Sequence, residues 1–325
     1  MPNDTTSRRR IAWLVGAVGL AVAITLVVRA GAPAVFGVLT RGGWLLLLVV
    51  PIHVLVLALD AAGWRPLLPG SLVPGPAYLT GVAIVREALS TFVPGRIGGE
   101  LVGIRMLVRR RIPMTTAAAS VVVEVTLWLV AQLIFAVAGL VILASSPSAG
   151  DIPRVGAIGL LIVSAAVALF VALQRHVGMF GLLQRLLRRV AGETVAGFFG
   201  SAEALDMAIA SIYRDPSALV LSVLWVLASF AVAAFETWLA LRVLGQPVGY
   251  GAAVVVESLT LLVQSAAFLV PAGLGTQEAS VLLLCGAVGV PAPAALALAI
   301  TRRGRQIILG IPAVIAWFWT ERREA

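Results

Sequence analysis

The stretch FVPGRIGGE, residues 92–100, interrupts a run of apolar residues. Proline blocks continuation of a helix, and glycine permits positive φ angles and close backbone approach. A second stretch, FLVPAGLGTQE at 268–278, interrupts another apolar run in the same way. Neither half of the two interrupted runs is a comfortable membrane span of about 20 residues. Each stretch therefore predicts a hairpin of two short helices that enters a membrane, turns and returns.

The composition places these hairpins in a membrane protein. The chain has 325 residues, of which 60% are hydrophobic and 12% are charged, and its mean hydropathy is +1.04. A soluble domain averages about a quarter charged residues. This composition excludes a soluble enzyme and a disordered protein, and it predicts a polytopic all-α membrane protein.

The apolar runs predict six full spans beside the two hairpins. The spans are expected at 11–28, 44–63, 114–143, 155–173, 217–241 and 294–319, and the hairpins at 77–108 and 252–289. The polar stretch 174–216 reads as an amphipathic segment on the inner leaflet. A cleaved signal peptide remains the alternative for the first span.

All 24 basic residues are arginines, and they punctuate the apolar runs instead of forming one patch. They therefore serve as topology signals and not as a nucleic-acid surface. Most of them fall on the cytoplasmic side when both termini are cytoplasmic. The first hairpin then enters from the cytoplasm and the second from outside.

The two hairpins resemble each other within a single domain, 1–325. The first repeat, 77–143, has prolines at 94 and 113, and the second, 252–319, has them at 271 and 291. Three full spans separate the hairpins, so the copies are expected to be antiparallel. Transporters use such inverted repeats, with the binding site at the broken helices. Chance similarity between apolar sequences is the alternative.

The first turn predicts an anion site. A helix that restarts after the turn presents free backbone N–H groups, and an arginine fork suits a phosphate. The candidate head-group ligands here are Arg96, Gly98, Gly99, Glu100 and Arg105. Glu100 is expected to hold Arg96 or Arg105. The alternative is a structural helix break with a self-contained arginine–glutamate pair.

The second turn and the helix after it supply the other candidates, Gly273, Gly275, Gln277, Glu278, Arg302 and Arg303. Glu278 either caps its helix or acts as a protonatable or cation-binding carboxylate.

Other charges at membrane depth are expected to face a partner or a wet cavity. Glu87, Glu124 and Glu257 are predicted to support the site, with Glu124 and one of the two arginines near a central cavity. Arg86 is assigned to a membrane interface, and His53 and Gln132 to packing or hydrogen bonding. One cysteine, Cys285, and two histidines predict neither a metal centre of those ligands nor a cofactor.

VPGRIGGE (93–100), VPAGLGTQE (270–278) and the segment Trp64–Leu68 resemble the transmembrane region of lysylphosphatidylglycerol synthases and its stand-alone relatives. The resemblance covers roughly residues 10–320. GTQEAS (275–280) and the closing arginines are most similar to the hopanoid-associated HpnL subgroup. The resemblance implies a flippase-like protein of a bacterial envelope that moves or binds lipids, with hopanoid as the lipid for the subgroup.

Three functions follow as expectations. The first is a lipid transporter in the bacterial inner membrane whose partners are membrane lipids, with a second copy of the chain or lipid-biosynthesis proteins as further partners. The second is a membrane-embedded enzyme that acts on a lipid head group through Glu100, Glu124 or Glu278. The third is a scaffold for envelope biosynthesis. Full synthases carry a soluble aminoacyl-transfer domain, which this chain does not show before it stops at Ala325, so the expectation is no enzyme activity.

Overall fold

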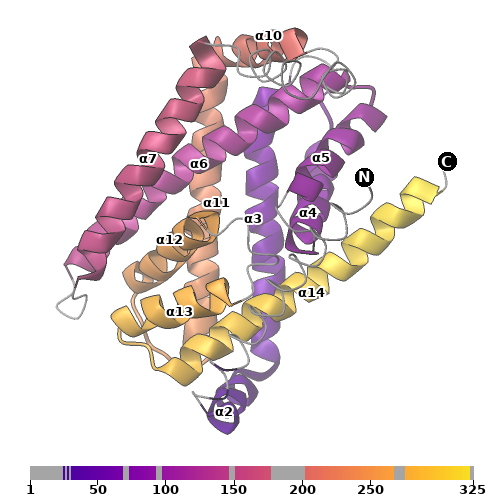
Figure 1. Ribbon diagram of the computed structural model, residues 1–325. Helices are drawn as coiled ribbons and strands as arrows, with labels where there is room; N and C mark the ends of the chain where they lie inside the picture. Colours follow the sequence, from indigo (N-terminus) through magenta and orange to yellow (C-terminus); the bar gives the residue numbers. More distant parts are fainter. Residues whose placement is uncertain are drawn as a thin grey trace, which may run out of the picture.

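The structure is a computed structural model that describes residues 25, 28, 31–68, 73–92, 97–145, 151–176, 202–266 and 275–322. These residues form helices and no strand, so the predicted all-α class is confirmed (Figure 1). The helices are α2 (Ala32–Gly42), η1 (Gly43–Leu48), α3 (Val49–Trp64), η2 (Arg65–Leu67), α4 (Pro76–Phe92), α5 (Ile97–Arg109), α6 (Met114–Ala144), α7 (Ile152–His176), α10 (Ala202–Tyr213), α11 (Pro216–Val243), α12 (Tyr250–Ala266), α13 (Thr276–Ala287) and α14 (Ala292–Arg322).

Among the described residues, four helical segments are long and apolar enough to cross a membrane. They are Ala32–Leu67, Met114–Ala144, Pro153–Arg175 and Pro216–Val243. Together with the composition they confirm a multi-pass membrane protein. The six predicted spans are not confirmed as a set: most of 11–28 lies outside the described residues, and the helix over 294–319 is not among these four segments. Residues 177–201 of the predicted amphipathic segment lie outside them as well.

Both interrupted runs form pairs of short helices. In the first pair α4 ends at Phe92 and α5 begins at Ile97, and in the second α12 ends at Ala266 and α13 begins at Thr276. The members of each pair pack against each other. Residues 93–96 and 267–274, which hold most of each turn, lie outside the described residues. The helix breaks fall where proline and glycine predict them, while membrane re-entry stays a prediction.

Two groups of three helices, α4–α6 and α12–α14, pack reciprocally. The first helix of one group, α4, packs against α14, and the corresponding helix of the other, α12, packs against α6. The helices that precede them, α3 and α11, pack against each other. Figure 1 shows that α3 runs from the α2 end toward the α10 end and α11 runs back, and that α6 and α14 also run in opposite directions.

Glycines bring the first helix pair unusually close together. A Cβ atom added at Gly99 of α5 would lie 2.2 Å from the Ser90 Oγ and 2.3 Å from the Arg86 carbonyl oxygen of α4. One turn later, a Cβ at Gly103 would lie 2.8 Å from the Arg86 Cδ. Small residues four apart let membrane helices approach closely. Gly99 and Gly103 therefore set the spacing that places Arg86 between α4 and α5.

Large apolar side chains cover the outside of the molecule. On α7, Leu161 and Ile162 are 70% and 67% exposed, and Val155 and Leu169 are similarly open. Such an apolar exterior is expected where lipid tails, and not water, surround a helix. The charged side chains at membrane depth are found inside instead.

Candidate functional site

A network of charged side chains occupies the interior between the helices. Its first part is Arg86 of α4, whose Nη2 donates to Glu124 of α6 at 2.7 Å and also to Glu100 of α5. The Arg86 guanidinium carbon lies 4.7 Å from the ring centre of Trp64, within cation–π distance. Arg86 is only 9% exposed, so its charge is buried among the helices, and its position at a membrane interface stays a prediction. Two carboxylates offset the cost of burying this charge.

The second part lies among α11, α12 and α14. Arg302 of α14 donates to Glu257 of α12 and, at 2.8 Å, to the Thr237 Oγ1 of α11. Thr237 in turn donates to Glu257 at 2.6 Å. This triangle gives the Nη2 of the buried Arg302 one carboxyl and one hydroxyl partner.

Glu278 of α13 carries two functions at once. Its Oε2 accepts a 2.8 Å hydrogen bond from the backbone N–H of Gly275, the N-cap residue, whose φ is 78°. Its Oε1 accepts from the Nε of Arg303 at 2.9 Å. Glu278 therefore caps its helix and also pairs with an arginine, while its role as a protonatable or cation-binding carboxylate stays a prediction.

The centre of the network is His53 of α3. Its Nδ1 lies 3.0 Å from Glu236 of α11, and its Nε2 lies 3.0 Å from both carboxylate oxygens of Glu87 on α4. Arg305 of α14 donates to the other oxygen of Glu236. Sequence reasoning expected His53 to pack or to bond, but it did not place His53 between two carboxylates. A lone histidine inside an apolar run was the available signal.

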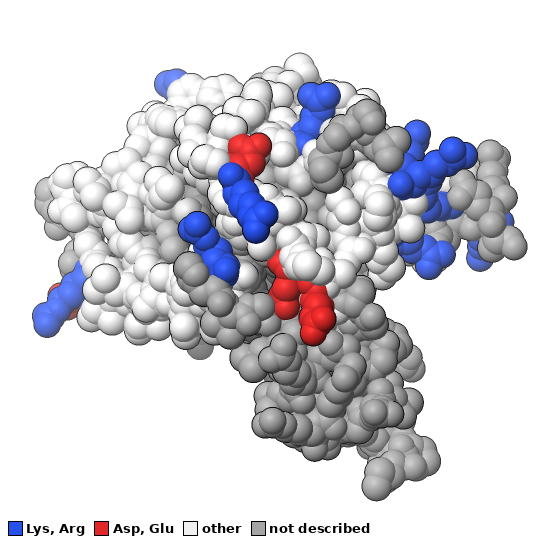
Figure 2. All heavy atoms as spheres, turned by 90° about the horizontal axis from the view of Figure 1, so that it is seen from above, with Lys and Arg blue, Asp and Glu red and all other residues white. Residues whose placement is uncertain are grey.

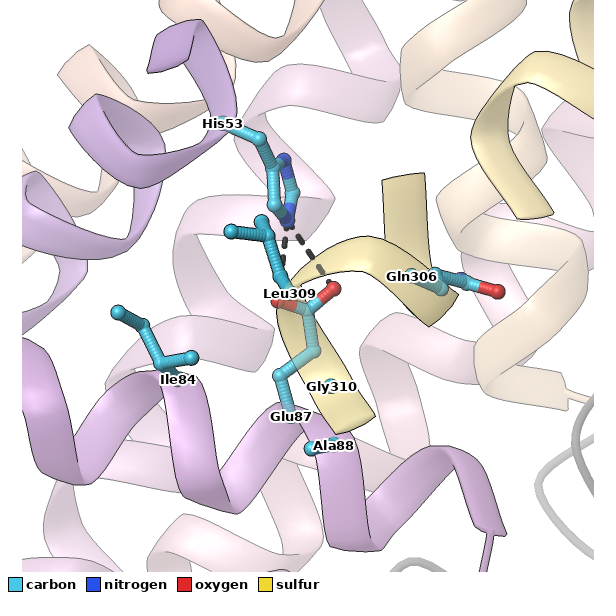
Figure 3. A pocket seen from close by; sticks show the side chains of 7 residues that line it. All are labelled: His53, Ile84, Glu87, Ala88, Gln306, Leu309 and Gly310. Carbon is cyan, nitrogen blue, oxygen red and sulfur yellow. Dashed lines mark hydrogen bonds and ion pairs between the residues drawn. The ribbon is translucent and has the colours of Figure 1, made fainter. Parts of the chain in front are cut away.

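A small pocket opens beside His53 and Glu87 (Figure 3). It is lined by His53, Ile84, Glu87, Ala88, Gln306, Leu309 and Gly310, and its volume of about 10 Å³ leaves room for about one water molecule. Figure 3 shows the Glu87 carboxylate pointing at the imidazole, with Leu309 beside the contact. This pocket admits water or a proton and is too small for a lipid head group.

The predicted head-group ligands are dispersed over the two helix pairs. Arg96 and Gly273 lie outside the described residues. Gly98, Gly99 and Glu100 lie in the first turn of α5, and Arg105 is exposed farther along that helix. Gln277 is buried beside Glu278. Of the predicted residues, the structure brings Glu100 together with Glu124 on Arg86, Glu257 with Arg302, and Glu278 with Arg303.

Further charges lie at the end of the molecule that carries α10. Figure 2 looks onto that end, where basic side chains gather mainly at one margin and uncharged surface fills most of the view. Arg109 at the end of α5 donates to the carbonyl oxygen of Thr320 near the end of α14, at 3.1 Å. The ends of these two helices therefore lie on the same side of the molecule, as the positive-inside rule predicts for the arginines that follow them.

The arrangement can bind opposite charges inside the membrane region. Each buried arginine named above already holds a carboxylate, so an anionic group could replace that carboxylate, and a cationic or hydroxyl group could bind the carboxylates themselves. Among the described residues, no group of three or more histidine, cysteine or acidic side chains is placed to hold a metal ion.

One comparison with known proteins gives a match. The model of a family described as the lysylphosphatidylglycerol synthase TM region matches residues 13–313. No curated protein matches the chain, and no solved structure matches it. The family match covers nearly the whole stretch in which the sequence motifs lie.

Proposed function

The chain belongs to the family of the lysylphosphatidylglycerol synthase TM region, a family of lipid-related membrane proteins, and on this premise we propose that it is a flippase-like lipid transporter. It moves hopanoid or another polar-headed lipid between the leaflets of the bacterial inner membrane, or toward the outer envelope. Both chain termini are cytoplasmic in this proposal.

The observation that carries the proposal is the buried network of paired charges. Four arginines, Arg86, Arg302, Arg303 and Arg305, lie on helices of the membrane region, and each donates to a carboxylate. Intramembrane charges are costly and typically line substrate or ion pathways. A polar head group needs such a path across an apolar barrier, whereas its tail can stay among the exposed apolar side chains.

The reciprocal helix packing supports an inverted repeat. In the first group, the residue eleven positions after Pro113 is Glu124, and it binds Arg86 of α4. In the second group, the residue eleven positions after Pro291 is Arg302, and it binds Glu257 of α12. The third helix of each group is thus tied to the first by an ion pair of reversed sign. Two antiparallel groups around one interior suit alternating access by rocking.

Reconstitution of the full chain into vesicles tests the proposal. Fluorescent phosphatidylglycerol and a labelled hopanoid are placed in both leaflets, and the outer-leaflet label is destroyed chemically. We expect the protected inner-leaflet fraction to fall much faster with protein than in empty vesicles. The variant Arg302→Met with Glu257→Leu removes one pair together and should slow this step, while Arg214→Ala on the exposed surface should not. Equal rates with and without wild-type protein would reject lipid transport.

Catalysis on a lipid head group is the second candidate. Glu100 and Glu124 converge on one nitrogen of Arg86, so two carboxylates lie close together as acid–base chemistry requires. Incubation with the same lipids and mass spectrometry would detect a covalently changed product. If the protein is instead a scaffold for envelope biosynthesis, it does not need the charged site. The variant Arg96→Ala with Arg302→Ala would then leave its function normal.

A further inference from the structure

The His53 contacts contain more protons than a neutral histidine can supply. Each of the two ring nitrogens lies 3.0 Å from a carboxylate oxygen. A hydrogen bond needs one proton on each of these two lines, because a carboxylate and an unprotonated ring nitrogen both only accept. A neutral imidazole carries one N–H. The second proton must therefore reside on the imidazole as well or on one of the carboxyl groups.

The neighbours of His53 indicate which contact holds the second proton. Arg305 donates to Glu236, which favours the ionised form of that carboxyl and lets it accept from the Nδ1–H of His53. A carboxylate that accepts from one ring nitrogen fixes the tautomer of a histidine. The exchangeable proton is then the one shared between Nε2 and the Glu87 carboxylate.

Of the two carboxylates that contact His53, only Glu87 is accessible from the pocket. The side chain of His53 is 9% exposed and that of Glu236 is 5% exposed, whereas Glu87 is 31% exposed and lines the pocket with His53. Figure 3 shows dashed contacts from the imidazole to the Glu87 carboxylate, and both groups line the pocket. A proton can therefore enter and leave through Glu87 and not through Glu236.

We propose that Glu87, His53 and Glu236 form a proton-binding site that couples proton movement to the relative position of the two helix groups. This proposal deepens the transport function above and rests on it. Binding forms one N–H or O–H bond at the Nε2–Glu87 contact with a proton taken from water, and release returns that proton to water. No other bond changes.

The position of the site explains how occupancy can move helices. Glu87 lies on α4, the first helix of the first group. His53 on α3 is tied through Glu236 of α11 to Arg305 of α14, the third helix of the second group. Without the shared proton, the lone pair of Nε2 faces a carboxylate and the contact becomes repulsive. The link between α4 and the α3–α11–α14 cluster is then lost, while the Glu236–Arg305 pair stays.

Other charged groups lie on the helices around the site, and each has a hydrogen-bond partner of its own. On the same helix, Asp60 accepts from the Ser229 hydroxyl of α11. On α6, Glu124 is held by Arg86 of α4. Glu87 and Glu236, which contact the imidazole directly, favour its proton-bound state through Coulomb attraction, and the positive charge of Arg305 opposes it.

The composition allows a direct test, because the chain has only two histidines. Replacing His176→Gln leaves His53 as the single imidazole, and ¹⁵N-histidine labelling of the full chain in bilayers then reports its two nitrogens. We expect both to be proton donors at low pH, and Nε2 alone to lose its donor character as pH rises through the range from about 5 to about 8. Glu87→Gln, which keeps the shape without the charge, should move this transition to lower pH. An imidazole that holds one proton throughout and ignores Glu87→Gln would overturn the proposal.

A second measurement addresses coupling. In vesicles with a gradient of about two pH units, one coupled proton can shift the lipid distribution between leaflets by up to about 100-fold. We expect a shift for wild-type protein that an uncoupler abolishes, and no such shift for Glu87→Gln. Wild-type lipid movement that ignores the gradient would overturn the coupling and leave lipid transport standing. A titrating His53 signal in a protein that moves no lipid would reject the transport function and retain the proton site.

Discussion

Glu124 on α6 accepts a 2.7 Å hydrogen bond from Arg86 on α4, across a separation of 38 residues in the chain. The pair joins the first and third helices of one group and is buried on both sides. Its strength decides how firmly the first broken helix pair is held against the long helix that follows it.

Removing the arginine should be costly. Arg86→Ala leaves Glu124 and Glu100 without this buried counter-ion, and breaking a buried pair from one side costs about 3–5 kcal/mol. Glu124→Gln keeps an acceptor for Arg86 and should cost less. Reversible unfolding in mixed detergent micelles gives the free energy of unfolding for each variant. Arg214→Ala, at an exposed position, serves as the control and should stay within about 0.5 kcal/mol of wild type. An Arg86→Ala protein as stable as that control would contradict the importance of the pair.

Close packing of α5 on α4 predicts a contrast between two glycines. Gly99→Ala would put a Cβ 2.3 Å from the Arg86 carbonyl oxygen, so the helices must separate, at a cost of about 1–3 kcal/mol. Gly81→Ala, in the interior of α4, meets nothing within 4 Å and should stabilise its helix by up to about 1 kcal/mol. The same unfolding assay compares them. Opposite signs are expected, and two equal effects would mean that the approach of α5 to α4 is unimportant for stability.

The start of α11 predicts a pH-dependent cap. Asp215 accepts from the backbone N–H groups of Ser217 and Ala218, both at 3.1 Å, and from the Ser217 hydroxyl. These hydrogen bonds, led by that of the Ser217 side chain, lower the pKa of Asp215 below its usual value. Because the folded pKa is the lower one, the cap contributes above the unfolded value of about 3.9 and is lost as pH falls through the folded value.

The difference in unfolding free energy between wild type and Asp215→Asn isolates this contribution, since asparagine also caps helices but does not titrate. We expect wild type to lose its advantage as the solution is acidified below about pH 4. An advantage that is constant down to acidic pH would show that Asp215 does not act as an ionised cap.

Side-specific labelling tests the proposed orientation. The single cysteine is buried, so Cys285→Ala provides a background without reactive thiols. Ser145→Cys, at the end of α6, and Ser211→Cys, on α10, then place exposed thiols near opposite ends of the molecule. With both termini cytoplasmic, a membrane-impermeant maleimide should label position 145 in intact cells, and position 211 only after permeabilisation. The reverse pattern would invert the topology and the side from which each hairpin enters.

The sequence by itself determined the class of the protein and the places where its helices break. Proline and glycine act through their own backbone geometry, so α4 and α5 separate near residue 94, and α13 begins directly after Gly275, without help from the rest of the fold. The length of an apolar run also depends on the local sequence alone, and it predicted the ends of α6 and α11 to within a few residues. The repeated Pro-to-charge spacing also singled out Glu124 and Arg302, which are buried, and the central cavity expected beside them stays a prediction.

Only the tertiary structure decided which charges meet. Arg86 faces Glu124 because α5 packs tightly on α4, and His53 faces Glu236, 183 residues away, because α3 and α11 cross the molecule together. A buried charge binds whichever opposite charge the packing places within about 4 Å, and this depends on helix positions that local periodicity does not contain. That is why a histidine expected to pack or to hydrogen-bond lies at the centre of the network, between the carboxylates of Glu87 on α4 and Glu236 on α11.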